Sequence, residues 1–435
     1  MRHYSTIRKG TAEINLASQP QNADGLIVSG GSSSVRHMAA TRTTASTRAE
    51  LAQSLMDDFL LRTGVTGDGE PVRYLWTDAF GLCNLLGLAE STGQPEYLSH
   101  AGTLIDQVHQ VLGRHRADDH RKGWISGLDE EQGRKHPTAG GLRIGKTLPE
   151  RRLGVPMDER LEWDRDGQYF HYLSKWAHAL DVASRRLADA PLGTWGRELL
   201  QTACDRFTVG APGSGLRMVW KMSIDLSRPL VASMGHHDPL DGYIRCLQLR
   251  ASALASGAAE AANAMSTRAD RLSAMIRRDD LATGDPLGLG GLLSDAAVLA
   301  QLIDGDSLVD DGMLDALLAA SIAGLHHYRA QGELQREATQ RLAFRELGLS
   351  IGLQGMEIVQ EQISSRGSVF RDAPGTKRSL HAIAALSALA PEIEAFWIAP
   401  EHRASTPWRE HQNINDVMLA TSLIPDAYLR LPAHR

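Results

Sequence analysis

Apolar residues recur at helical spacing through most of the chain after Ala45, and the helical segments come in pairs. Alternating runs of β-branched residues bounded by turns, which are typical of half-buried strands, are scarce. The sequence therefore predicts a nearly all-α protein. The predicted pairs are Trp76–Ser91 with Glu96–Leu112, Gly167–Leu187 with Gly193–Phe207, Asp238–Ala255 with Ala258–Arg277, Gly291–Ile303 with Asp311–Arg329, and Phe344–Gln362 with Ser379–Leu389.

Two further helices have no sequential partner, the amphipathic Ser46–Arg62 at one end and the apolar Ile414–Ile424 at the other. If these two pack side by side, inner and outer helices close a ring that leaves no apolar end exposed. We therefore expect an (α/α)6 toroid, in which the N-terminal helix closes the ring against the C-terminal helix. An open solenoid of helical hairpins is the alternative, although the sequence shows no fixed repeat period and no capping repeat.

The expected organisation is a single toroid domain over residues 45–435, preceded by a flexible polar tail over residues 1–44. The tail is rich in Ser, Thr, Gly and Ala and has too few large apolar residues to offset its ordering entropy. Met38 and Met56 are alternative candidate start residues. Most of the excess length between helices lies in two connections, 113–166 and 208–237, and long connections in a compact domain are usually functional.

Charge and composition exclude several classes of partner. The chain has 46 basic and 52 acidic residues and no basic stripe of the kind that follows a phosphate backbone, so we expect no nucleic acid partner. It has no apolar run of the length, about 18 residues, that crosses a membrane. Cys83, Cys204 and Cys246 lie far apart in helical stretches, which predicts buried thiols in a reducing compartment. The predicted location is the cytoplasm.

As an architecture, residues 45–430 resemble the six-hairpin glycosidase-like superfamily, because six inner and six outer helices can be assigned in chain order. Members of that superfamily include unsaturated-uronide hydrolases and sugar epimerases of the N-acylglucosamine type. The resemblance implies a carbohydrate-active enzyme. It also implies an active site in the funnel formed by the loops that lead into the inner helices.

The stretch EWDRDGQYFHY before the second inner helix is the strongest single chemical signal. Glu162, Asp164 and Asp166 place three carboxylates within five residues, just ahead of a helix N-terminus. Neighbouring negative charge raises the pKa of one carboxyl, which suits a general acid; Asp164 is the first candidate and Asp166 the second. His171, one turn into the helix, is a candidate catalytic base. Helix capping with an ion pair to Arg165 is the structural alternative.

A second polar cluster, HHDPLD, precedes the third inner helix. We predict His236 and His237 as catalytic residues, because a histidine can act as a base on a sugar carbon or hydroxyl. Asp238 and Asp241 are predicted to bind substrate. A divalent metal and a polar cap with Pro239 in the first turn are the alternatives, and the prediction carries no metal ligand.

Aromatic side chains gather in the loops that enter the inner helices, although aromatic residues make up only 5% of the chain. Sugar pockets use such rings as walls and use carboxylates and amides to bind hydroxyls. Six of the eight tryptophans are expected at this rim, namely Trp76, Trp124, Trp163, Trp220, Trp397 and Trp408. The substrate-binding residues predicted from these loops are Trp76, Asp78, Trp163, Tyr169, Tyr172 and His411.

Residues 140–147, GGLRIGKT, satisfy the G-x-x-x-x-G-K-[ST] expression of phosphate-binding loops. That chemistry needs a strand before the motif and a helix after it, and the sequence predicts neither. We therefore expect no nucleotide hydrolysis here. Arg143 and Lys146, with His136 nearby, are instead predicted to hold an anionic group of the substrate, such as a carboxylate or phosphate.

The sequence thus predicts a glycoside hydrolase or a sugar epimerase or isomerase that works by general acid/base catalysis on a sugar or sugar acid, without a cofactor. Hydrolysis needs two carboxyls across a bond, whereas epimerisation needs two bases on opposite faces, and the rim offers both residue types. Two other classes stay open. One is a non-catalytic toroid that binds a ligand or a protein, and the other is a lyase or cyclase that acts on a non-sugar substrate.

Overall fold

Six helices stand side by side in a closed ring in the computed structural model, which describes residues 33–211, 215–304, 309, 311–370 and 372–433. Each helix of the ring packs against the next, and the last packs against the first. This closure confirms the predicted (α/α)6 toroid. The ring helices are α2 (Leu75–Thr92), α6 (Phe170–Leu187), α8 (Asp238–Ala255), α10 (Pro286–Leu302), α12 (Ala343–Arg366) and α17 (Gln412–Leu423).

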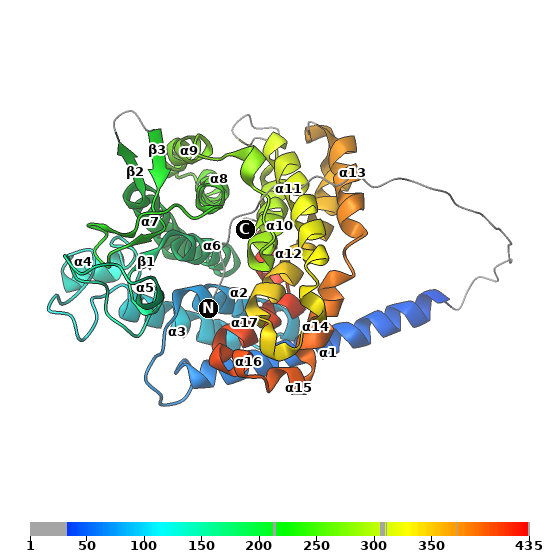
Figure 1. The fold of residues 1–435 in the computed structure, drawn as a ribbon, viewed down its shortest axis with the longest axis horizontal. Helices are drawn as coiled ribbons and strands as arrows, with labels where there is room; N and C mark the ends of the chain where they lie inside the picture. Colours follow the sequence, from blue (N-terminus) through cyan, green and yellow to red (C-terminus); the bar gives the residue numbers. More distant parts are fainter. Residues whose placement is uncertain (1–32, 212–214, 305–308, 310, 371, 434–435) are drawn as a thin grey trace. The chain divides into compact units, whose positions relative to one another are not determined.

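Outer helices pack on the ring helices that precede them in the chain (Figure 1). They are α3 (Glu96–Leu112), α7 (Ala190–Phe207), α9 (Ala259–Ser273) and α11 (Asp311–Ala330), followed by α13 (Ala373–Ala384) and α14 (Leu389–Ile398), which share the cover of α12. The single outer helix expected over Ser379–Leu389 is therefore wrong. Pro391 lies in the first turn of α14, where its ring and missing N–H prevent the preceding helix from continuing.

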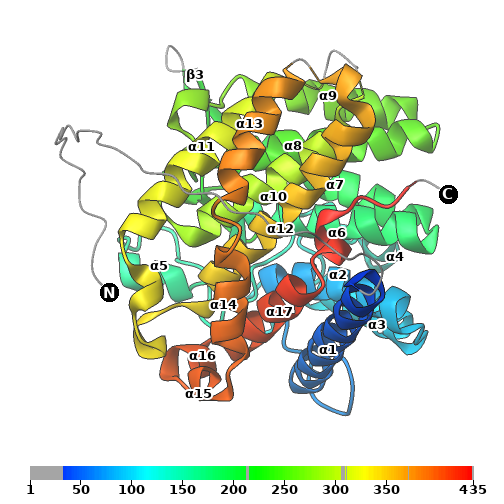
Figure 2. The same ribbon diagram turned by 90° about the vertical axis from the view of Figure 1, so that its right-hand side faces the viewer.

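The remaining outer position is filled by α1 (Ser33–Arg62), which begins earlier than the expected Ser46. Residues 46–435 form one compact unit, and most of the expected tail, residues 1–32, lies outside the described residues. Figure 2 shows α1 beside α17 and α3. The Arg62 guanidinium pairs with Asp416 of α17 at 2.5 Å, and the Tyr97 hydroxyl of α3 donates to Asp57 at 2.8 Å. As predicted, the first and last helices of the toroid meet.

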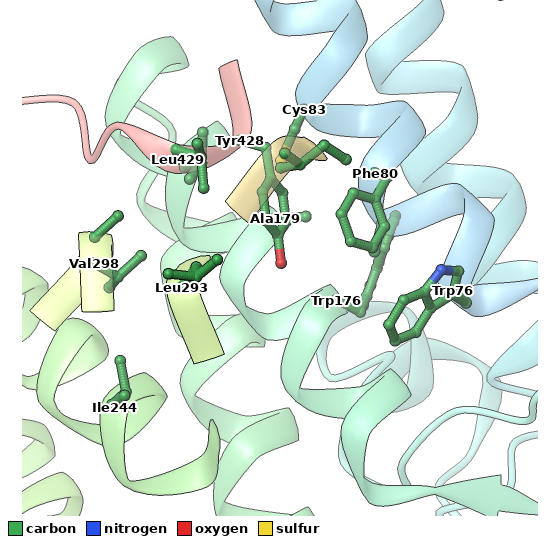
Figure 3. Packing of buried hydrophobic residues seen from close by; sticks show 14 of the residues in the cluster. Trp76, Phe80, Cys83, Trp176, Ala179, Ile244, Leu293, Val298, Tyr428 and Leu429 are labelled. Atoms are coloured by element: carbon green, nitrogen blue, oxygen red, sulfur yellow. The ribbon is translucent and has the colours of Figure 1, made fainter. Parts of the chain in front are cut away.

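The ring is filled by side chains from its own helices and from α18 (Asp426–Leu429) near the end of the chain. Phe80 of α2 stacks on Tyr428 with a 4.4 Å centroid distance, and Figure 3 shows these rings among apolar side chains of the neighbouring helices. Close approach of α10 and α12 depends on glycine. A Cβ on Gly290 would lie 2.0 Å from the Gly348 carbonyl oxygen, so any larger residue would push the two helices apart. Cys83 and the other two thiols are buried and free, as expected.

The two long connections form the irregular part of the unit and meet at the start of α6. Residues 113–166 carry α4 (Glu130–Lys135) and α5 (Glu159–Asp164). Strand β1 (Gln168–Tyr169) pairs antiparallel with β4 (Lys221–Met222), and β4 pairs with β5 (Pro229–Val231). A separate hairpin joins β2 (Thr208–Ala211) to β3 (Gly215–Met218). The chain ends with α15 (Pro400–Arg403), α16 (Thr406–Glu410), α17 and α18 (Asp426–Leu429).

Among the helices of the described residues, none combines the length and the apolar character needed to cross a membrane.

Candidate active site

Four aromatic rings contact His171 where α2, α6 and β4 come together. The imidazole stacks on Tyr169 at 5.3 Å and lies parallel to Trp220 at 6.3 Å, with interplanar angles of 27° and 12°. Trp76 of α2 approaches it edge-on at 6.0 Å. Tyr172 contacts both the imidazole and Trp76, and its hydroxyl lies 2.5 Å from that of Tyr74. The cluster therefore presents aromatic walls around one titratable side chain.

The backbone around this cluster is fixed by the pairing of β1 with β4, which sets Tyr169 opposite Lys221. The Gln168 side-chain oxygen accepts from the Leu142 N–H at 2.9 Å, and its amide donates to the Ile224 carbonyl at 2.6 Å. Gly141, at a φ of 76°, leaves room for this amide, because a Cβ there would lie 2.0 Å from the Gln168 oxygen. One buried glutamine thus joins the glycine-rich loop, β4 and the start of α6.

His171 faces Asp238, the first residue of α8, with 3.7 Å between Nδ1 and Oδ1. This distance is longer than a hydrogen bond. Within the described residues, the buried Nδ1 of His171 and the buried Oδ2 of Asp238 have no hydrogen-bond partner. Most buried polar atoms in native proteins are hydrogen-bonded, so an unpartnered atom on each of two facing side chains needs an explanation. A substrate hydroxyl or carbonyl placed between them would supply the missing partners.

Burial shifts the pKa values of this pair in opposite directions. Burial lowers the pKa of His171 to about 4, which keeps the imidazole neutral at ordinary pH. Burial, together with the nearby charge of Asp241, raises the pKa of Asp238 to about 7. Between these values the site holds an unprotonated base next to a protonated acid, which is the arrangement that general acid/base catalysis requires.

Behind Asp238, a buried ionic network crosses the ring from α6 to α10. Asp241 accepts from the Lys175 ammonium at 2.7 Å and also from the Ser174 hydroxyl. The positive charges of Lys175 and Arg245 outweigh burial and lower the pKa of Asp241. Arg245 continues the network to Asp295 at 2.6 Å. The network fixes the first turn of α8 and supplies the negative charge that helps to keep Asp238 protonated.

Asp166, predicted as a general acid, is enclosed by cations and backbone N–H groups. It is fully buried, and Oδ2 accepts from Arg143 at 2.5 Å, with Arg116 at 3.5 Å. Its other oxygen accepts from the Gly145 and Gly167 N–H groups. Arg143, predicted to bind an anion, is buried and also donates to two backbone carbonyls, so each of its three side-chain nitrogens already donates one hydrogen bond. The two residues anchor the glycine-rich loop, which forms neither a strand nor a helix.

Several other predicted residues lie away from His171. Asp164 is exposed at the end of α5. His236 and His237 stack on each other, and their Nε2 atoms contact the carbonyls of Asp280 and, at 2.9 Å, of Leu281. Both imidazoles therefore contact the backbone of residues 280–281. His411 is exposed and packs edge-on against Phe344.

A cavity of about 240 Å³ lies beside His236 and does not include the aromatic cluster. It is lined mainly by apolar side chains of residues 234–240 and 275–281. From α8 it is lined by Pro239 and Leu240, and not by Asp238 or Asp241. We therefore place the candidate active site at the aromatic cluster, where the unpartnered acid and base lie.

The predicted binding residues divide into those the structure brings together and those it does not. Trp76, Tyr169 and Tyr172 line the cluster, and Trp163 reaches it through Trp220, at a centroid distance of 4.8 Å. The Lys146 ammonium lies 5.3 Å from the Tyr74 ring. Asp78 is buried 3.4 Å from Arg73 and accepts from the Tyr74 N–H, so it caps α2. Burial raises its pKa to about 6.

The expected rim of tryptophans is only partly found. Trp76, Trp163 and Trp220 gather at the site. Trp124 is buried under the Arg114 guanidinium, and Trp397 packs against Trp408, 5.6 Å away and also buried.

Sequence analysis gave no role to Lys175, although it follows His171 by four residues and so shares its helix face. A charged residue on the apolar inner face of a helix was the available signal. No comparable signal in the sequence distinguishes Asp238 from the adjacent His236 and His237, because the distinction depends on the contact of Asp238 with His171 of α6.

Across the described residues, no group of three or more His, Cys, Asp or Glu side chains is placed to hold a metal ion.

No family model and no curated protein match the chain. Among solved structures, it is similar to the alpha-1,6-mannanase GH76A from Salegentibacter sp. HEL1_6, with 13% identity, a TM-score of 0.47, and coverage of 87% of this chain and 99% of that one. It is also similar to the cellobiose 2-epimerase from Spirochaeta thermophila DSM 6192, with 14% identity, a TM-score of 0.46, and coverage of 88% and 98%.

Proposed function

We propose that the chain is a sugar epimerase or isomerase in which His171 and Asp238 transfer protons to and from the substrate. The observation that carries the proposal is the pair itself. The half-buried imidazole of His171 and the buried carboxyl of Asp238 lie 3.7 Å apart, and each has one buried atom with no hydrogen-bond partner among the described residues. The neutral imidazole would accept a proton from a carbon or hydroxyl of the sugar. The protonated carboxyl would donate one to the developing oxyanion or carbanion.

The surroundings of the pair support a sugar as the substrate. Apolar faces of sugar rings stack on aromatic side chains, and Trp76, Tyr169 and Tyr172 offer such faces around His171. The hydroxyls of Tyr74 and Tyr172 lie 2.5 Å from each other in this cluster and can bind sugar hydroxyls. The Trp76 indole N–H is buried without a hydrogen-bond partner among the described residues, which adds one donor.

Proton transfer at a sugar carbon fits this site better than glycoside hydrolysis. Hydrolysis by paired carboxylates needs a second carboxyl roughly 5 to 9.5 Å from the general acid, free to act as nucleophile or base. Asp241 is held by Lys175 and Ser174. Farther along the rim, Glu162 is held by Arg151 and Lys221, and Asp166 by Arg143. The titratable side chain that faces Asp238 is therefore a histidine, His171, and not a second carboxyl.

The test is incubation of the full-length protein in D2O with D-mannose, D-glucose, cellobiose and α-1,6-mannotriose, followed by NMR. The proposal predicts an epimer or isomer of at least one sugar, with deuterium on the carbon that loses its proton. Cleavage without deuterium incorporation would identify a hydrolase and contradict the proposal. Absence of any conversion or exchange across the panel would also contradict it.

Matched variants assign the reaction to the pair. Asp238→Asn and His171→Asn should each lower the conversion rate at least 100-fold, which is the usual contribution of a general acid or base. Asp164→Asn, the same change at an exposed carboxylate on α5, should leave the rate within about twofold. Equal activity of Asp238→Asn and wild type would exclude Asp238 from the chemistry.

A further inference from the structure

Trp163 and Trp220 continue the aromatic cluster outward from His171 toward solvent. Trp220 lies parallel to the imidazole at 6.3 Å and tilted on Tyr169 at 5.2 Å. Trp163 then meets Trp220 edge-on at 4.8 Å and is 52% exposed. Each step along this row is comparable with the size of one pyranose ring. The row therefore extends beyond the space that one sugar at His171 would occupy.

The backbone beneath both indoles is held firmly although Trp163 itself is open to solvent. Glu162, beside Trp163, pairs with Arg151 at 2.9 Å and with the buried Lys221 ammonium at 3.1 Å. Lys221, beside Trp220, also donates to the Glu162 carbonyl at 2.6 Å. The backbone N–H of Trp220 donates to the Ser233 carbonyl at 2.8 Å. Because the backbone beneath both rings is already held, a ligand that stacks on them has little backbone left to order.

We propose that Trp163 and Trp220 form an outer sugar-binding subsite, so that the substrate is a chain of at least two sugar units. This inference rests on the proposed function, because it assumes that one sugar unit occupies the site at His171. The terminal unit lies at the pair His171 and Asp238, and the next unit stacks on the outer tryptophans. The surface of an exposed indole favours a neutral pyranose with an apolar face.

The test is calorimetric measurement of the Kd of the full-length protein for matched ligands: D-glucose against cellobiose and cellotriose, and D-mannose against α-1,6-mannotriose. For at least one series, wild type should bind the longest sugar roughly tenfold more tightly than its monosaccharide, as burial of one further ring face predicts. Trp163→Ala should abolish that difference without changing the Kd for the monosaccharide. Trp163→Phe should keep most of it.

Leu153→Ala is the matched control, because Leu153 is an 85% exposed apolar residue of the same connection. It should keep the preference for longer sugars. Thermal unfolding of each variant checks that it is folded. An unchanged preference in Trp163→Ala would overturn the subsite, and so would equal wild-type affinity for monosaccharide and chain, while the proposed function would stand. If no sugar of either length binds, both the subsite and the proposed function fail.

Discussion

Two groups of acidic side chains lie near the start of α6, and they differ in what their oxygens touch. Around the glycine-rich loop, Asp166 accepts from Arg143 and from backbone N–H groups, and Glu162 pairs with two cations. At the start of α8, Asp238 has no cation within ion-pair distance among the described residues. It faces His171 across 3.7 Å, and one of its buried oxygens has no hydrogen-bond partner there. The first group holds the loops in place, and the second is available for a substrate.

The difference separates a stabilising carboxylate from a reactive one. A buried carboxylate with cationic partners stays charged and contributes to the folded state, whereas its removal leaves those cations unpaired. A buried carboxyl without such a partner takes up a proton and lowers stability at high pH. Density of carboxylates in the sequence therefore does not identify the acid. The acid is identified by the number of hydrogen-bond and ion-pair partners that each carboxylate has in the folded protein.

Asp166→Asn should have the largest effect on stability. The change removes the negative charge that Arg143 and Arg116 surround, so we expect a loss of about 3 to 5 kcal/mol in the free energy of unfolding. Urea unfolding followed by circular dichroism measures it. Wild-type stability for this variant would show that the Asp166 cluster does not hold the loop.

Asp238→Asn should change stability in the opposite direction. Because the pKa of Asp238 is raised to about 7 in the folded state, that state binds the proton more tightly than the unfolded chain, and stability falls as pH rises from about 4 to about 7. Asparagine removes this cost. At pH 8 we expect a gain on the order of 2 to 4 kcal/mol. The same urea titrations measure this gain. If Asp238→Asn is less stable than wild type at pH 8, the contrast between Asp238 and the stabilising Asp166 is contradicted.

Activity should depend on pH in a bell-shaped profile. His171 must be unprotonated, so kcat/KM should fall as pH decreases through about 4. Asp238 must be protonated, so kcat/KM should fall as pH increases through about 7. One pH unit beyond either limit the loss should be about tenfold. The residual activity of Asp238→Asn should lack the alkaline limb, and a limb that persists in that variant would assign it to another group.

Asp164→Asn should have the smallest effect. Asp164 is exposed, and substitutions at such positions usually change stability by less than about 0.5 kcal/mol. The same urea and kinetic measurements apply. A large loss of activity would restore Asp164 as the acid first expected from the sequence and would overturn the assignment to Asp238.

The fold could be predicted because its signal is local and repeated. Helical periodicity located Glu96–Leu112 and Asp238–Ala255 with the bounds that the structure has. Unpaired helices at the two ends then predicted a closed ring. The division into α13 and α14 was missed because one proline in an otherwise helical pattern was not given its weight.

The aromatic part of the site was also predictable, because Trp76, Tyr169 and Tyr172 enter the ring at the starts of neighbouring helices. The roles of the acids were not. Asp166 meets Arg143 from 23 residues away, and His236 meets the Asp280 carbonyl from 44 residues away. No local pattern shows which carboxylate receives an arginine and which remains without one.

The most direct test of the account is the infrared difference spectrum between wild type and Asp238→Asn as a function of pH. A buried protonated carboxyl has a carbonyl stretch that is separate from that of ionised carboxylates. The account predicts that wild type shows this band at pH 5.5, that the variant lacks it, and that it disappears with a midpoint near pH 7. If no difference band is seen at pH 5.5, Asp238 is ionised at that pH. This result would contradict the claim that Asp238 is the protonated acid of the site.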